Sequence, residues 1–172
     1  MTSRNPDRLR LQLEFLDSHS DVVMLETQIE FLIGNVPQRA LRMPADHEEI
    51  ESRLLKGRAG LCNPSLMFRT SAAINCLDYP AGLVGEDIDF SLQMCERGRV
   101  ANFDRVLFQY RLQTAQSSMA KSKDAVRMSR YAAHRAYFRR KGLPAPSVDE
   151  FLQGASLISQ WQWSMGAWEL IQ

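Results

Sequence analysis

The chain has 172 residues, which is enough for one domain with a core of its own. Hydrophobic residues make up 45% and charged residues 24%, as in ordinary globular proteins, and a formal net charge of +1 gives no electrostatic argument for nucleic-acid binding. The three cysteines, Cys62, Cys76 and Cys95, are odd in number and lack CxxC spacing. This pattern argues against a disulfide framework and against a zinc site, and it is typical of a protein in the reducing cytoplasm.

The hydrophobic pattern predicts a mixture of helices and strands, that is, an α/β or α+β fold. The expected elements are a helix over 5–21, a buried strand over 22–25, a half-exposed strand over 27–31, a loop over 35–45, a helix over 46–57, a strand over 66–69, a helical turn from 70, a helix over 86–97, strands over 99–103 and 106–113, and helices over 124–141 and from 147. In the first helix we expect Asn5 to be the cap, and Leu9, Leu13 and Leu16 to form the apolar stripe. No apolar run approaches the ~18 residues of a membrane-spanning helix.

The stretch "GEDIDFSLQMCERG" places two acidic residues, Glu86 and Asp87, at the start of a predicted helix that ends at Gly98. Two interpretations are open. Acidic side chains are favoured in the first turn of a helix, where they accept hydrogen bonds from free backbone N–H groups and meet the positive end of the helix dipole. The same pair could also form the reactive end of an active site, and the stretch alone favours the cap.

Three segments, in a fixed order along the chain, give support to the active-site interpretation. They are "NPDRLRLQLEFLDSHSDVVMLETQIEFL", "LCNPSLMFRTSAAI" and "GEDIDFSLQMCERGRVANFDRVLFQYRLQ". Together, over residues 5–118, they resemble the C-terminal half of a family 2 glycosyltransferase with a GT-A fold. The resemblance implies a partial GT-A-like mixed sheet with flanking helices over residues 1–119, and a C-terminal helical extension over 120–172 that packs on it.

The resemblance also implies a chemistry for the acidic pair. Enzymes of this family move a sugar from a nucleotide diphosphate donor to an acceptor hydroxyl, usually with inversion, and a base must take the hydroxyl proton. The resemblance places that base on Asp87, with Glu86 supporting it or contacting the acceptor. A helix N-terminus would orient the carboxylate and keep it ionised, so the roles of cap and base are compatible.

The family binds its nucleotide-sugar donor with Mg²⁺ or Mn²⁺ at a DxD motif in the N-terminal half. The only such letters here, Asp87–Asp89, lie inside the acceptor helix. We therefore expect no metal ligand and no cofactor bound by this chain alone, no activity by the chain alone, and either a separate donor-binding half or a homo-oligomer as partner. A sheet edge left open by the missing half also predicts association or poor solubility.

Four further residues are candidates for substrate binding. Ser65 and Arg69 belong to "NPSLMFR", where a structural role is the alternative because the neighbouring residues are apolar. Arg111 could meet a diphosphate as a charged donor, or form a surface ion pair. Gln113 stands where the family usually has histidine, and it is a poor ligand for a divalent cation.

Two other functions remain open beside that of an acceptor-side transferase part. One is a non-catalytic, glycan-binding module derived from the same family. The other is an interaction protein whose basic helix over 124–141 and tryptophan-rich tail dock on a partner or on a membrane surface. The resemblance implies a glycan or lipid-linked acceptor, and a location in the cytoplasm, peripheral to the inner face of the membrane.

Overall fold

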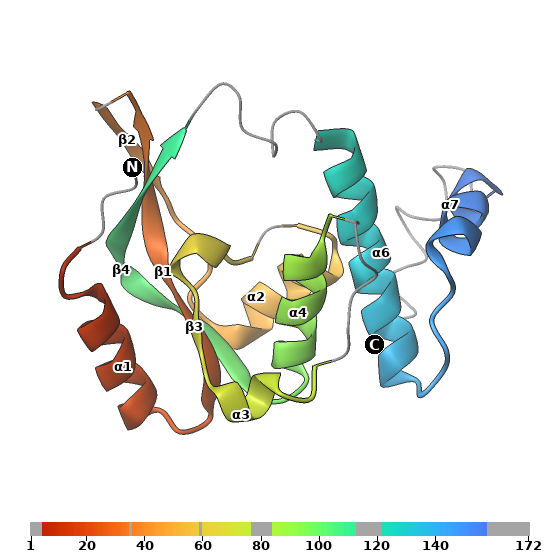
Figure 1. Cartoon of the computed structure of the whole chain (residues 1–172), viewed down its shortest axis with the longest axis horizontal. Helices are drawn as coiled ribbons and strands as arrows, with labels where there is room; N and C mark the ends of the chain where they lie inside the picture. Colours follow the sequence, from red (N-terminus) through yellow and green to blue (C-terminus); the bar gives the residue numbers. More distant parts are fainter. Residues whose placement is uncertain (1–4, 35, 59, 77–83, 113–121, 158–172) are drawn as a thin grey trace.

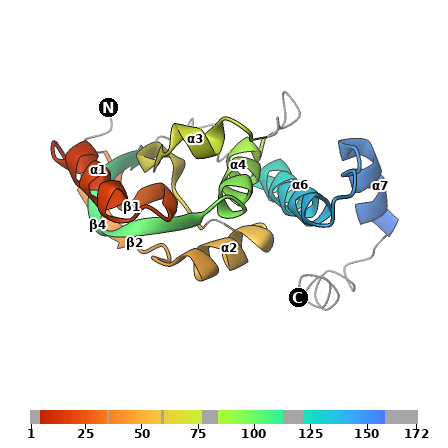
Figure 2. The same ribbon diagram turned by 90° about the horizontal axis from the view of Figure 1, so that it is seen from below.

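The computed structural model describes residues 5–34, 36–58, 60–76, 84–112 and 122–157 (Figure 1). They form a four-stranded mixed sheet with helices on both faces, which confirms the predicted α/β class. The longer helices are α1 (Arg8–Ser18), α2 (His47–Leu55), α4 (Glu86–Cys95), α6 (Ser122–Arg140) and α7 (Val148–Leu157). Helix α1 covers one face of the sheet, α2 and α4 cover the other, α6 lies beyond α4, and α7 is outermost (Figures 1 and 2).

The central strand of the sheet is β1 (Val22–Ile33), which pairs with every other strand. On one edge it runs parallel to β4 (Arg99–Leu112) along its whole length. On the other edge its first part pairs with β3 (Met67–Phe68) and its last part with β2 (Val36–Leu41), both antiparallel. Because strands or helices cover β1 on all sides, every residue from 22 to 29 is buried.

The sheet differs from the predicted elements in three places. The two strands expected over 22–25 and 27–31 are one continuous strand, and those expected over 99–103 and 106–113 are also one, with an irregularity where the register passes from Phe103 to Val106. The loop expected over 35–45 is wrong, because β2 occupies most of it. Pro37 is tolerated there because β2 is an edge strand that pairs only with β1.

The apolar stripe expected on the first helix is also wrong. Leu9 and Leu13 are 56% and 55% exposed, and the buried face of α1 carries Arg8, Gln12 and Leu16 instead. Arg8 and Gln12 both donate to the carbonyl oxygen of Ser65, at 3.0 and 2.8 Å, and Arg8 also donates to Gln12 Oε1 at 2.9 Å. This buried polar network fixes α1 to the sheet in a position that leucines alone would not specify.

The main apolar core lies between the sheet and the pair α2 and α4. It includes Met24, Ile50, Leu54, Leu92 and Val100. A second, smaller cluster of Leu16, Val22 and Leu25 joins α1 to the opposite face. Neither cluster reaches α7, which is held to α6 by a third group around Met128, Tyr131 and Phe151.

The cap expected at Asn5 is wrong, because the N-cap of α1 is Asp7, and Asn5 Oδ1 accepts from the backbone N–H of Asp7 at 2.9 Å. Two other helix starts carry side-chain caps. Asp46 Oδ1 accepts from the backbone N–H of Glu49 at 2.9 Å at the start of α2. At the start of α7, Ser147 and Glu150 form the reciprocal pair of a capping box, with Ser147 Oγ accepting from Glu150 N–H at 3.2 Å and Glu150 Oε2 accepting from Ser147 N–H at 2.8 Å. Two short helices, η1 (Asn63–Ser65) and α3 (Thr70–Ala73), lie between α2 and α4 in the chain. The tryptophan-rich tail lies outside the described residues.

Candidate functional site

The candidate site is the N-terminus of α4, and a glycine sets its position. Gly85 caps the helix with φ +98°, a left-handed conformation that side chains rarely adopt. A Cβ atom there would lie 3.1 Å from the backbone carbon of Met128, so α6 packs directly on the turn before α4. Glu86 and Asp87 follow in the first helical turn, and both residues are exposed to solvent.

Asp87 has the cap-like contact that its position predicts. Its Oδ1 accepts from the backbone N–H of Ile88 at 2.8 Å. Partial burial of the carboxyl group raises the pKa of Asp87 above its usual value, and the charge of Glu86 acts in the same direction. The hydrogen bond from Ile88 opposes this shift but does not cancel it. Asp87 is therefore a solvent-reached carboxylate with a stronger affinity for a proton than an ordinary aspartate.

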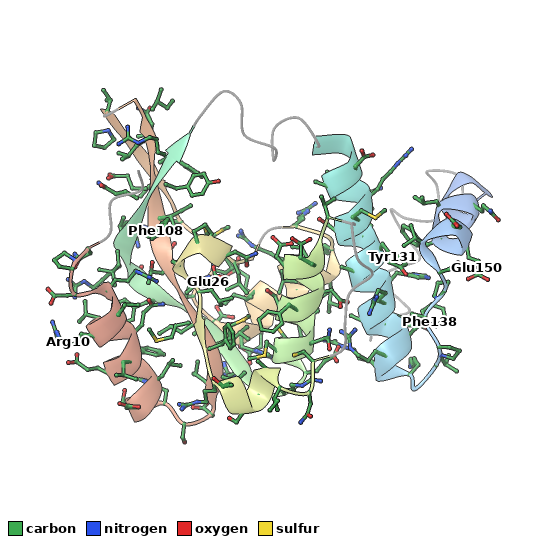
Figure 3. The ribbon with its side chains drawn as sticks, in the orientation of Figure 1. Arg10, Glu26, Phe108, Tyr131, Phe138 and Glu150 are labelled. Atoms are coloured by element: carbon green, nitrogen blue, oxygen red, sulfur yellow. The ribbon has the colours of Figure 1, made fainter. Side chains whose placement is uncertain are left out.

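A second carboxylate faces this helix start from the sheet, and it was not among the predicted site residues. Glu26 lies in the middle of β1, is 0% exposed, and points into the layer between the sheet and α2 and α4 (Figure 3). Its Oε2 accepts from the backbone N–H of Cys62. The pKa of Glu26 is raised to about 8, mainly by burial and in part by the charge of Asp87, so the two carboxyl groups are within electrostatic reach of each other.

Asn102 is the neighbour of Glu26 on β4. The two are direct partners in the parallel register, so their side chains leave the sheet on the same face. Asn102 Nδ2 donates to the carbonyl oxygens of Pro44 at 2.7 Å and Gly60 at 3.1 Å. The floor of the site is thus a polar patch of Glu26 and Asn102, next to the apolar residues Met24 and Val100 of the same sheet face.

Asp89 has a different environment from Asp87, although both belong to the sequence "DID". It is 0% exposed and faces α6, where its Oδ1 lies 3.4 Å from Arg135 Nε and 3.5 Å from Arg139 Nη1. Burial raises the pKa of Asp89, and the two arginines act against that shift. Because Asp89 pairs with these two arginines, Asp87 and Asp89 are not arranged to bind together the divalent cation that the DxD motif of the resembled family holds. Among the residues that the structure describes, no group of three or more His, Cys, Asp or Glu side chains could hold a metal ion.

Ser65 and Arg69, two of the predicted substrate-binding residues, make structural contacts. Ser65 is buried, and its Oγ accepts from the backbone N–H of Thr27 at 3.1 Å. Arg69 donates to the carbonyl oxygens of Val22 at 2.9 Å and Leu16 at 2.5 Å. These contacts join η1 and the start of α3 to β1 and to the end of α1, as the structural alternative expects.

Arg111 lies at the far end of the sheet. It pairs in register with Leu32 of β1. Leu32 lies about 20 Å along the strand from Glu26, at the usual rise per residue. Its Nη1 donates to the carbonyl oxygen of Gly34 in the hairpin between β1 and β2. The structure therefore does not bring Arg111 together with the α4 terminus, and Gln113 lies outside the described residues.

Several arginines of the basic helix α6 form ion pairs with acidic side chains of the same chain. Arg139 pairs with Glu96 at 2.7 Å as well as with Asp89, and Arg140 pairs with Glu51 at 2.7 Å. The remaining cations of the helix include the exposed Arg127 and Arg130. Figure 3 shows Tyr131 of α6 on the side toward α7, which carries Glu150. The exposed basic surface of α6 is therefore smaller than the number of arginines in the helix suggests.

No protein-family model matches the chain, and comparison with curated proteins gives no match either. The geometry of the site and the sequence resemblance therefore carry the functional argument together. In the described residues, no helix combines the length and the apolar character that crossing a membrane requires.

Glu26 and Asn102 are the site residues that sequence reasoning missed. One signal was present, because a glutamate within the run "VVMLETQI" interrupts an otherwise buried strand, and carboxylates are rarely buried without a partner. Asn102 gave no such signal, since its place beside Glu26 depends on the pairing of β1 with β4.

Proposed function

We propose that this protein is the acceptor-side part of a glycosyltransferase, in which Asp87 is the base that takes the proton of an acceptor hydroxyl. The observation that carries the proposal is the position of Asp87: it lies at an exposed helix N-terminus, and its pKa is raised. A base works best when its pKa approaches the working pH, and burial moves Asp87 in that direction.

The proposed chemistry is an inverting displacement. The acceptor hydroxyl would donate a hydrogen bond to the Asp87 carboxylate, and its proton would pass to that carboxylate as the oxygen forms a bond to the anomeric carbon. The bond between that carbon and the donor phosphate would break, and the nucleoside diphosphate would leave with the electron pair. Glu86, which is exposed in the same turn, would contact other hydroxyls of the acceptor. The described residues do not provide the cradle for the donor, so a separate donor-binding half remains part of the proposal.

The first test is binding of the acceptor to the chain alone. Saturation-transfer NMR with a panel of mono- and disaccharides should detect binding, and the backbone amide of Ile88 should shift because its hydrogen-bond acceptor is Asp87. The second test is sugar transfer after a nucleotide-binding half is supplied. Asp87→Asn should abolish transfer without loss of the circular dichroism spectrum.

Asp149→Asn is the matched control, because Asp149 is an exposed acid in the first turn of α7. It should leave both saccharide binding and transfer unchanged. Transfer that survives in Asp87→Asn would refute the base assignment. Saccharide binding without transfer, unaffected by Asp87→Asn, would instead support the non-catalytic glycan-binding alternative, and no saccharide binding at millimolar concentration would refute both.

A further inference from the structure

Two buried oxygen atoms on the floor of the site have no hydrogen-bond partner among the described residues. They are Glu26 Oε1 and Asn102 Oδ1. Glu26 is 0% exposed and Asn102 is 4% exposed, so water does not reach either side chain freely. Their strands are about 5 Å apart and their side chains share one face of the sheet, which places the two unpaired acceptors in the same small volume.

Both side chains hold the same loop. Cys62 N–H donates to Glu26 Oε2, while Asn102 Nδ2 donates to Gly60 O and to Pro44 O. The two carbonyl contacts use both N–H bonds of the Asn102 amide, so its orientation is fixed and its oxygen can only accept. Attachment to loop residues only two positions apart keeps the Glu26 and Asn102 side chains together.

One proton would satisfy both oxygens. A buried acceptor without a donor is costly, and two acceptors cannot bond to each other. If Glu26 is protonated at Oε1, however, its O–H becomes the donor that Asn102 Oδ1 lacks. Among the described residues, two titratable groups interact with Glu26, namely Asp87 at the start of α4 and the thiol of Cys62. The charge of Asp87 opposes a negative charge on Glu26, whereas the backbone N–H of Cys62 favours one. Burial and the charge of Asp87 outweigh the contact with Cys62 and raise the pKa of Glu26 to about 8, which agrees with a proton held at pH 7.

We propose that Glu26 is a neutral carboxylic acid in the resting protein and acts as a positioning residue for Asp87, by donating from Oε1 to Asn102 Oδ1 and accepting from Cys62 at Oε2. In this state Asp87 is the only charged carboxylate of the two. Loss of the proton to solvent would break the bond to Asn102 and place a second negative charge near Asp87, which raises the pKa of that residue. The positioning role rests on the proposed function, whereas the protonation of Glu26 does not.

The test follows carboxyl and amide carbons by ¹³C NMR in the wild-type protein between pH 4 and pH 10. The Glu26 carboxyl carbon should titrate with a midpoint near pH 8, so that about tenfold more acid than carboxylate is present at pH 7. The side-chain carbonyl carbon of Asn102, which does not ionise, should shift with the same midpoint because its oxygen loses a donor. Asp87→Asn should lower the Glu26 midpoint, and Asp149→Asn should leave it unchanged.

A Glu26 midpoint near that of a free glutamate would overturn the proposal. So would an Asn102 carbonyl carbon that stays constant while Glu26 titrates, or a Glu26 signal that moves on addition of Mg²⁺ or Ca²⁺ at constant pH, since a bound cation would then satisfy the two oxygens. None of these measurements needs a sugar, so their failure is distinct from failure of the proposed function. If transfer is found, the wild-type rate should change with a midpoint near pH 8, because ionised Glu26 alters the pKa of Asp87. Glu26→Gln should keep activity at pH 7 and lack this step, a difference that a purely steric role of Glu26 does not predict.

Discussion

Replacement of Glu26 by glutamine should stabilise the protein at neutral pH. The glutamine amide can accept from Cys62 N–H through its oxygen and donate to Asn102 Oδ1 through its nitrogen, so both contacts of the neutral acid survive. It also removes a cost. In the unfolded chain Glu26 has its ordinary pKa of 4.5, whereas in the folded protein the pKa is about 8, so folding at pH 7 requires uptake of a proton.

The magnitude follows from the difference between the two pKa values. Each unit between 4.5 and the working pH costs about 1.4 kcal/mol, so the penalty at pH 7 is about 3 kcal/mol. Between pH 4.5 and 8 the folded state binds more protons than the unfolded state, and Glu26 therefore makes stability fall as the pH rises. Above pH 8 both states are ionised and this contribution becomes constant. Below pH 4.5 Glu26 is protonated in both states and the penalty disappears.

Urea denaturation at pH 5, 6, 7 and 8 measures this effect directly. The free energy of unfolding of Glu26→Gln should exceed that of the wild type by a margin that grows between pH 5 and pH 8 and reaches about 3 kcal/mol at pH 7. Glu30→Gln, on the same strand at a half-exposed position, is the control and should follow the wild-type pH dependence. Parallel curves for wild type and Glu26→Gln would show that Glu26 is ionised in the folded protein and would refute the reasoning.

Three further substitutions test how α4 and α7 are held. Gly85→Ala should cost about 1–3 kcal/mol, because the residue has φ +98° and its Cβ would meet the α6 backbone; an unchanged melting temperature would contradict this. Asp89→Ala should cost about 3 kcal/mol or more in urea denaturation, since Arg135 and Arg139 would lose a buried carboxylate, and a loss below 1 kcal/mol would count against a buried ion cluster. Ser147→Ala should cost about 1 kcal/mol by removing a helix cap, with faster amide exchange in the first turn of α7 as its local sign.

The elements that could be predicted from the sequence are those whose signals are local. The helix starts at Asp46, Glu86 and Ser147 each depend on residues within one helical turn, and each was predicted correctly. The apolar stripe of α1 was not, because leucine spacing alone does not show which face meets the sheet. Arg8 and Gln12 occupy the buried face only because the carbonyl oxygen of Ser65, far away in the sequence, accepts from both.

The candidate site divides in the same way. Asp87 could be singled out from its neighbours in the chain, since a helix start with two acids is visible in the sequence. For Glu26 the sequence shows only a glutamate within an apolar strand. Its neutral form could not be predicted, because it depends on burial by α2 and α4 and on a loop that approaches from another part of the chain. Strand β2 was missed for a related reason: Pro37 argues against a central strand, and only the pairing partner shows that this strand lies at an edge.

The contact between the α6 backbone and Gly85 limits how this protein could exchange parts with others in evolution. The expected boundary between residues 119 and 120 separates α6 from α4, yet the tight turn before α4 is shaped to the surface of α6. A recombination event at that boundary would replace α6 by another helix, which would have to pack on the turn at Gly85 as closely as α6 does. The two segments should therefore be inherited together, and in distant homologues we expect a glycine at position 85 to coincide with a helix that approaches as closely as α6.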